Sequence, residues 1–597
     1  MPPFDLQKTT AELATGYGST ETFEALRQGQ LAKRMYLVQR LLSSAEGHPD
    51  AEAAGLPQAF AHLTRLQHEH PEVVGRLLSS PITGGWLLRA LHHLANLPRE
   101  DAGVVLRQTF GYPGWLAAAA MIRSRTAGEV TVVVRRGVVM LPGVGLLRLA
   151  AADVDGYGTA ELRITTDGIL TAAHRGRETT IDTTVSERSD QPGEWIPVGR
   201  LSSDDDPVDV ILDDLDPFRT MDTRTMPTAI SASQLRVWQH TFRGAWQTLQ
   251  EYHPAYAAGM AAGLQSIVPL SAEPVVQVLS NTWPEAYGAI RAALPSGRFN
   301  LASVLIHEFQ HAKLSALLDY VELTDPAAAQ KRFYAPWRSD PRPAVGLLQG
   351  IYAHTAIADF WRVHRNHPDA NKNLAETQFA RWTVQVDRAI TEFKNSGALN
   401  EAGASFVATV HRTLAPWLDE PLSDNAFWVA EEVVLAHQVA YRVRNLTPDE
   451  GHVRQLAQRW HSGDPAGEVH SFDRAFRPAS LTVDWRKGDL PADYVRLAGA
   501  GSGVRAGAGA GDLALAAQDY PAAIAAYGAE IAKSPDAPDL WAGLAVALTR
   551  ARPSDGMRPL TEATETVAAL YGLLAAEQPG EPVGAEALVN WLTEGPR

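Results

Sequence analysis

The spacing of apolar residues changes along the chain and predicts four segments. Residues 1–127 repeat apolar positions three and four residues apart, as in ALRQGQLAKRMYLVQRLLSSA, which predicts an N-terminal helical domain. Residues 128–228 carry β-branched runs broken by Gly and Pro, as in GEVTVVVRRGVVMLPGVG, which predicts a β-rich segment. Residues 229–497 return to helical spacing, and residues 498–597 hold a linker and a helical tail. The expected fold class is therefore α+β, mainly α.

The tail resembles a tetratricopeptide repeat over GDLALAAQDYPAAIAAYGAEIAKSPDAPDLWAGLAVAL. Tyr520, Ala523, Tyr527 and Pro535 lie where that repeat has its aromatic, small and terminal proline residues, and Trp541 begins a second copy in phase. One or two copies are too few for a solenoid. We therefore expect either a helical hairpin packed on the main body or a surface that binds a peptide. The stretch AGAGSGVRAGAGAGD before it predicts a flexible linker.

Composition excludes several kinds of site. The 597 residues include no cysteine, so iron–sulfur clusters are excluded and any metal must be held by His, Asp or Glu. The formal net charge of −15 argues against nonspecific nucleic-acid binding. The first residues lack the pattern of a secretory signal, and no apolar run reaches the roughly 20 residues of a membrane span. We expect a cytoplasmic protein without a membrane partner, bacterial by its Ala-, Arg- and Gly-rich composition.

The strongest chemical motif is HEFQH, an HExxH motif formed by His307, Glu308 and His311. Residues four apart lie one turn apart on the same face of a helix, so the two imidazoles can bind one ion. The apolar residues around them predict a buried helix, and buried His and Glu side chains are costly unless they have partners. The alternative is a packed helix whose His and Glu face the surface, because so short a motif also occurs by chance.

Two imidazoles need a third ligand from elsewhere in the chain. The helical stretch LLQGIYAHTAIADFW makes His354 the favoured third ligand and Asp359 the reserve. Gly350, one turn before His354, would allow a backbone or a ligand to approach closely. Arg338 and Arg342 lie in a proline-rich loop that suits capture of a carboxylate. That carboxylate could belong to a cosubstrate, to a peptide or to the protein itself.

Two chemistries fit such a site. In a zinc metallopeptidase the ion activates water and Glu308 is the general base, but the extended HExxHxxGxxH motif is absent and Glu322 is a poor candidate for a ligand. In a non-haem iron enzyme the ion keeps open positions for 2-oxoglutarate and O2, and an arginine anchors the far carboxylate of 2-oxoglutarate. A third alternative is a non-catalytic scaffold that binds a peptide through the tail.

Three stretches resemble one protein family. HEFQHAKLSALLDY, FYAPWRSDPRPAVGLLQGIYAHTAIADFW and EAYGAI are similar to the HExxH-domain proteins encoded beside genes for ribosomally made, post-translationally modified peptides. The likeness covers most of residues 1–450 and is densest over 285–361. It implies an iron(II)- and 2-oxoglutarate-dependent dioxygenase that β-hydroxylates a precursor peptide, with Asp or His as plausible targets. In that setting Glu308 would support the metal ligands or orient the substrate.

The same resemblance implies specific roles for residues of this chain. His307 and His311 would bind iron, and His354 would be the third ligand. Either Arg338 or Arg342 would anchor 2-oxoglutarate. Three histidines would depart from the usual combination of two histidines and one carboxylate.

Overall fold

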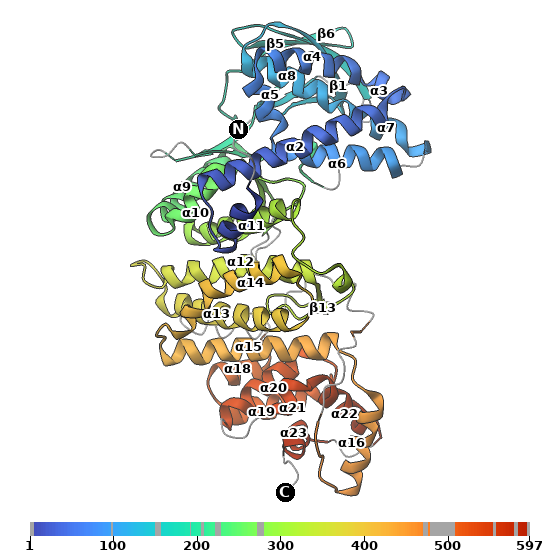
Figure 1. The fold of residues 1–597 in the computed structure, drawn as a ribbon. Coiled ribbons are helices and arrows are strands. Elements are labelled where there is room, and N and C mark those ends of the chain that lie inside the picture. Colours follow the sequence, from blue (N-terminus) through green and yellow to red (C-terminus); the bar gives the residue numbers. More distant parts are fainter. Residues whose placement is uncertain are drawn as a thin grey trace. The chain divides into compact units, whose positions relative to one another are not determined.

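A computed structural model describes residues 5–96, 99–149, 157–190, 193–203, 208–220, 228–270, 280–469, 476–477, 508–552, 557–577 and 583–593. The chain divides into two compact units, Met1–Val321 and Glu322–Arg597 (Figure 1). Helices predominate, and the two larger sheets lie in the first unit, so the expected fold class of α+β, mainly α, is confirmed. None of the helices in the described ranges is long and apolar enough to cross a membrane.

The first unit begins with helices that often have proline in the first turn. Proline suits that position because its fixed φ matches the helix and its missing N–H would have no intrahelical partner. Pro49 and Pro71 are such residues. The helices are α1 (Leu6–Ala14), α2 (Thr20–Ala45), α3 (Pro49–Ala53), α4 (Leu56–Glu69), α5 (Pro71–Leu78), α6 (Pro81–Asn96), α7 (Arg99–Phe110) and α8 (Tyr112–Ser124).

An antiparallel sheet follows, with the strand order β6-β5-β4-β1-β2-β3-β7. Arg136 and Gly137 both have positive φ and join β1 to β2 in the tight hairpin turn that matches strand twist. Side chains of α4, α6 and α8 share one hydrophobic core with this sheet, so the expected helical domain and β-rich segment are packed together. The strands are β1 (Gly128–Arg135), β2 (Val138–Leu141), β3 (Gly145–Arg148), β4 (Tyr157–Ile164), β5 (Ile169–His174), β6 (Arg177–Asp182) and β7 (Trp195–Pro197).

A second, mixed sheet of the first unit has the order β11-β12-β10-β9-β8, in which β10 pairs in parallel with β9 and β12. The helix α11 carries HEFQH and packs against α9, α2 and β12. The elements are β8 (Gly199–Ser202), β9 (Asp209–Leu212), η1 (Pro217–Arg219), α9 (Ala232–Tyr252), α10 (Pro254–Gly263), β10 (Ser266–Pro269), β11 (Ser280–Asn281), β12 (Ala289–Ala292) and α11 (Arg298–Leu318).

The second unit is helical apart from one short antiparallel pair, β13 and β14, in its described part. That pair joins the two ends of the proline-rich loop that precedes α12. The elements before the tail are η2 (Pro326–Ala328), β13 (Arg332–Phe333), β14 (Arg342–Pro343), α12 (Ala344–His364), α13 (Lys372–Asn395), α14 (Glu401–Leu414), η3 (Ala415–Asp419), α15 (Asp424–Asn445) and α16 (Glu450–Ser462).

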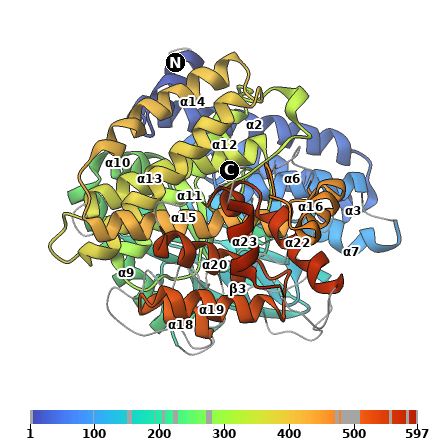
Figure 2. The ribbon, with the colours of Figure 1, turned by 90° about the horizontal axis from the view of Figure 1, so that it is seen from below.

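The tail is helical and packs on the rest of the second unit. Figures 1 and 2 both place α20 beside α15, and the two helices contribute side chains to one hydrophobic core. This agrees with a helical hairpin packed on the body, whereas the likeness to a tetratricopeptide repeat stays a prediction. The part of the expected linker up to residue 507 lies outside the described residues. The helices are α18 (Ala510–Ala516), α19 (Tyr520–Ile531), α20 (Pro538–Ala551), α21 (Arg558–Glu562), α22 (Thr564–Glu577) and α23 (Ala585–Thr593).

Candidate functional site

The HEFQH helix is buried on most of its surface. The apolar residues of α11 around the motif are almost fully buried, and Ile306 and Phe309 are 1% and 3% exposed. Residues spaced four apart along one side, Ser303, His307 and His311, are only partly buried. The side chains of the two histidines therefore lie on the one strip of this part of the helix that is open enough for a ligand to reach.

The two imidazoles converge. The ring centroids of His307 and His311 are 4.7 Å apart at an interplanar angle of 86°, and their Nε2 atoms are 3.2 Å apart. Two nitrogens bound at the usual length to one ion at a tetrahedral angle would lie about 3.3 Å apart. The same separation fits a hydrogen bond in which one ring donates to the other. Without an ion the pair can share a proton, and with an ion it can chelate.

Glu308 is held in place by a second element. Glu308 is 2% exposed. The hydroxyl of Thr282, just after β11, donates to Oε2 of Glu308 at 2.7 Å. The same hydroxyl lies 3.0 Å from the backbone carbonyl of Glu308. A buried carboxylate fixed in this way is restricted in its rotamers, so its oxygens are positioned rather than mobile.

Lys313 was missed by the sequence reasoning, although it lies two residues after the motif. It is 1% exposed, and its ammonium group donates to the backbone carbonyls of Gly16 and Tyr17 at 2.9 and 3.3 Å. Burial lowers the pKa of Lys313 to about 7. Its position in the middle of an apolar helix was the available signal, since lysine is almost never fully buried without partners.

The structure gives His354 the tautomer that a metal ligand needs. Its Nδ1 lies 2.8 Å from the carbonyl oxygen of Gly350, and a carbonyl only accepts, so Nδ1 carries the proton. In a neutral imidazole the lone pair is then on Nε2, and a ring fixed through a backbone carbonyl is typical of metal-binding histidines. The ring is stacked on Trp337 at 4.4 Å and lies 4.7 Å from Trp382.

Gly350 allows a close approach, but the approaching group is the indole side chain of Trp337 rather than the expected backbone or ligand. A Cβ atom built on Gly350 would lie 2.3 Å from Nε1 of Trp337. Glycine is therefore needed on this face of α12 for Trp337, which comes from the proline-rich loop, to reach His354.

The reserve ligand and the two arginines already have partners within the second unit. Asp359 is 3% exposed and accepts two hydrogen bonds from Arg362, at 3.1 and 2.9 Å. Arg338 and Arg342 both donate to the carboxylate of Asp340, at 2.8 and 3.0 Å. The sequence allows these arginines to hold a carboxylate of a cosubstrate, of a peptide or of the protein itself. In the structure they hold one of the protein itself, Asp340.

The site residues fall into both units. His307, Glu308 and His311 belong to the first, whereas His354 and the arginines belong to the second. Across the described ranges, no group of three or more His, Asp or Glu side chains is gathered where it could hold a metal ion. The convergence of three histidines on one ion stays a prediction.

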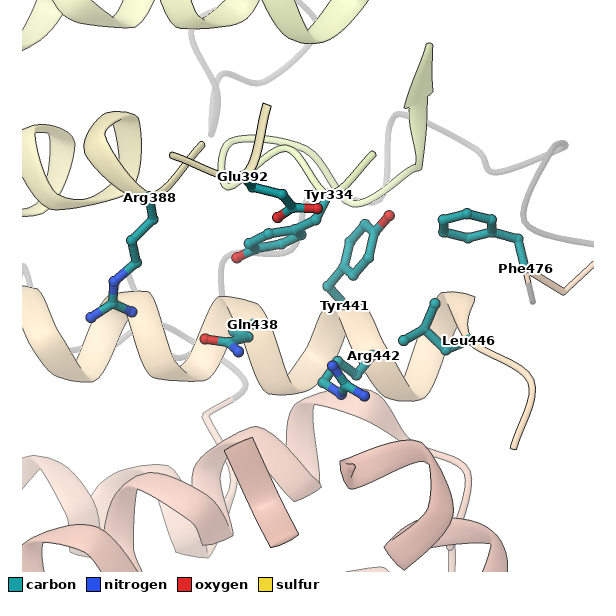
Figure 3. Close-up of a pocket in the computed structure, with 8 residues that line it drawn as sticks. All are labelled: Tyr334, Arg388, Glu392, Gln438, Tyr441, Arg442, Leu446 and Phe476. Carbon is teal, nitrogen blue, oxygen red and sulfur yellow. The ribbon is translucent and has the colours of Figure 1, made fainter. Parts of the chain in front are cut away.

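A small pocket in the second unit lies beside α15 (Figure 3). Its volume is about 130 Å³, and Tyr334 and Tyr441 lie side by side at its wall with ring centroids 4.7 Å apart. The Tyr334 hydroxyl lies 2.8 Å from Nδ1 of His437, a residue to which the sequence assigns no role. Burial and the positive charges of Arg381 and Arg444 lower the pKa of His437 to about 3, so this imidazole is neutral near pH 7, and its hydrogen bond with Tyr334 holds the ring in place.

Comparison with known proteins adds no assignment. No protein-family model matches the chain, and no curated protein matches it. The resemblance to the HExxH-domain peptide-modifying proteins therefore depends on the quoted stretches of sequence alone.

Proposed function

We propose that this protein is an iron(II)- and 2-oxoglutarate-dependent dioxygenase that β-hydroxylates a side chain of a ribosomally made precursor peptide. The observation that carries the proposal is the 3.2 Å separation of the Nε2 atoms of His307 and His311 on a partly exposed strip of a buried helix. Such a pair has the donor type and spacing for a divalent first-row metal. The choice of oxidation comes from the sequence resemblance.

The surroundings of the other residues fit that choice. His354 has the Nδ1–H tautomer, which suits a third ligand through Nε2. When bound, iron with 2-oxoglutarate and O2 supplies the oxidising power, and this chain's own residues bind and orient the reactants. Glu308, held by Thr282, would fix the position of the helix or of the substrate.

The arginines have the geometry to anchor a carboxylate. Asp340 is held by Arg338 and Arg342 from two sides, and the two arginine side chains are 43% and 35% exposed. The far carboxylate of 2-oxoglutarate would compete with Asp340 for these guanidinium groups, because both are planar anions that accept the same charge-assisted hydrogen bonds. In the proposal one of the two arginines therefore exchanges partners when the cosubstrate binds.

The alternative is a zinc metallopeptidase, which the HExxH motif itself favours. Hydrolysis needs the Glu308 carboxylate as the general base for a metal-bound water. The hydrogen bond from Thr282 at 2.7 Å uses one oxygen of that carboxylate and leaves the other able to accept a proton, so only the sequence resemblance favours oxidation over hydrolysis.

The test combines metal analysis with mass spectrometry of the peptide. The full chain is co-expressed with the peptide encoded beside its gene, and the purified protein is supplied with Fe(II), 2-oxoglutarate and O2. We expect release of succinate and a peptide heavier by one oxygen atom. His307→Ala and His311→Ala should abolish both, whereas His240→Ala, which removes an exposed histidine of α9 in the same unit, should abolish neither.

The other outcomes identify the alternatives. Zinc-dependent cleavage of the peptide that is lost in Glu308→Gln would replace the dioxygenase by a metallopeptidase. A peptide that binds without a metal and is released unchanged in mass, with binding lost when the tail is deleted, would leave a scaffold. In either case the hydroxylase proposal is wrong.

A further inference from the structure

A cavity of about 340 Å³ in the first unit is lined by side chains from well-separated parts of the sequence. The end of α5, the start of α6, α8, the strands β8 and β9, and the start of β10 all border it. Its volume lies in the range of pockets that hold small molecules, which is about 300–1,000 Å³. None of the residues predicted to bind a metal or 2-oxoglutarate lines this cavity.

Arginines give the cavity an excess of positive groups at one wall. Arg76, Arg123 and Arg200 come from α5, α8 and β8 and all line the cavity. Arg200 forms an ion pair with Asp209, whereas neither Arg76 nor Arg123 has an ion-pair partner among the residues that the structure describes. Like charges gathered around a cavity repel one another, and an anion bound between them would relieve that repulsion.

The electrostatics of Arg123 reflect this crowding. Burial lowers the pKa of the Arg123 guanidinium, the positive charges of Arg200 and Arg76 lower it further, and the negative charge of Asp209 offsets part of this. The guanidinium also lies close to the backbone at Gly143, where a Cβ atom would be 2.9 Å from Nη1. Gly143 has a φ of +71°, so this turn needs glycine for its conformation as well as for the space.

Two buried hydroxyl groups at the cavity wall have no hydrogen-bond partner among the described residues. Ser79 and Ser266 are 4% and 3% exposed, and within the described ranges the Oγ atom of each has no hydrogen-bond partner. Buried hydroxyls are normally paired because the loss of water must be compensated. Both residues line the cavity, and because their Oγ atoms are almost wholly covered, each hydroxyl would donate to an oxygen acceptor there after a rotation about χ1.

The same wall contains the start of a long helix. Ser80 and Pro81 line the cavity and lead into α6, which has 16 residues. The first N–H groups of a helix have no intrahelical partners and lie at the positive end of its dipole, so they favour anions. The helix end adds to the arginines and the serine hydroxyls and points to the same kind of ligand.

Two buried acidic residues of the cavity repel a bound anion less than two fully ionised carboxylates would. Asp213 and Asp216 line it and are 8% and 1% exposed. Burial raises the pKa of both carboxyls, and the charge of Asp216 raises that of Asp213 further. Near neutral pH each therefore has a larger protonated fraction than an exposed carboxyl, which reduces the negative charge at the cavity wall.

We propose that this cavity binds a small molecule through a phosphoryl group, with Arg76 and Arg123 as the charged ligands and the hydroxyls of Ser79 and Ser266 as donors to the same group. Guanidinium forks, hydroxyls and a helix start are the donors that phosphate oxygens accept from in proteins. The cavity is larger than a phosphate ion requires, so the rest of the ligand occupies the part bordered by β9 and β10. The site does not depend on the proposed hydroxylase activity.

The probe is inorganic pyrophosphate, titrated into the full chain by isothermal titration calorimetry at constant ionic strength. We expect saturable binding at one site. Arg76→Gln and Arg123→Gln should each weaken it about tenfold or more, because each removes a charge-assisted contact. The matched control is Arg40→Gln on α2, which removes an exposed arginine outside the cavity and should change the affinity less than twofold.

Ser266→Ala separates binding from folding. It removes a buried hydroxyl that has no partner in the described structure, so the midpoint of thermal unfolding should stay the same or rise while pyrophosphate binding weakens. Unchanged pyrophosphate affinity in this variant would overturn the proposed contact. No saturable binding by the wild-type chain, or equal weakening by Arg40→Gln, would overturn the site. Citrate binding as tightly as pyrophosphate would overturn the phosphoryl assignment.

Discussion

Removing Arg442 should release the tail helix α22 from α15. Arg442 donates to Glu565 through Nε and Nη2 at 2.7 and 2.6 Å, and the two side chains are 11% and 4% exposed. In Arg442→Met the Glu565 carboxylate keeps its burial and loses both of these contacts. Breaking a buried pair from one side costs about 3–5 kcal/mol, because the remaining buried charge loses its ion-pair partner.

The second step of the same prediction is a double variant. Arg442→Met with Glu565→Leu removes both charges and leaves two apolar side chains of similar size in the buried position. Replacing a whole buried pair by apolar residues is often close to neutral in stability. The double variant should therefore be more stable than Arg442→Met. With Glu565→Leu alone as the fourth member, the complete double-mutant cycle gives the coupling energy between the two residues.

Hydrogen–deuterium exchange across α22 is the suitable assay, because it reports the opening of this helix separately from unfolding of the first unit. A loss of about 3 kcal/mol corresponds to exchange faster by roughly a hundredfold. The matched control is Arg454→Met, which breaks the ion pair between Arg454 and Glu450. Their side chains are 66% and 80% exposed. That pair should contribute less than about 0.5 kcal/mol. Equal exchange of α22 in Arg442→Met and Arg454→Met would refute the reasoning.

Two further predictions concern His437 and the loop arginines. Because the pKa of His437 is lowered to about 3 in the folded state, the unfolded state takes up a proton on this imidazole at a higher pH than the folded state does. The stability of the second unit therefore falls as the pH drops below 6.5. Between pH 7 and pH 4.5 the free energy of unfolding, measured by urea titration, should fall by about 2–3 kcal/mol less in His437→Gln than in the wild type. An unchanged pH dependence of the unfolding free energy would contradict this. Asp340→Asn should lower the KM for 2-oxoglutarate by weakening the competing contact with Arg338 and Arg342, whereas Asp419→Asn, an exposed residue of the same unit, should not. A KM unaffected by Asp340→Asn would argue against these arginines as the anchor.

Local features of the site were predictable because they depend on one helix. The spacing of His307 and His311 requires only that residues four apart share a helix face, and the structure brings their Nε2 atoms to 3.2 Å. The sequence also predicted a close approach at Gly350, but it did not identify the approaching residue, Trp337. Trp337 reaches Gly350 through a loop closed by β13 and β14, and no sequence spacing specifies that contact.

The partners of charged residues were less predictable. The sequence predicts that Arg338 and Arg342 hold a carboxylate, and the carboxylate they hold lies between them in the sequence at Asp340. By contrast, Arg442 pairs with Glu565, a residue more than a hundred positions away, and this pair depends on how the tail packs on α15. A short-range pattern carries no information about such a distant partner.

The sequence by itself determined the order of helical and β-rich segments, the exclusion of cysteine chemistry and the pairing of two imidazoles on one face of α11. These follow from backbone periodicity and composition, which act within a few residues. Only the tertiary structure brought Arg76, Arg123 and Ser266 to one cavity, because they come from α5, α8 and β10. Their convergence is decided by the packing of helices on sheets, which depends on the whole hydrophobic core rather than on any one segment.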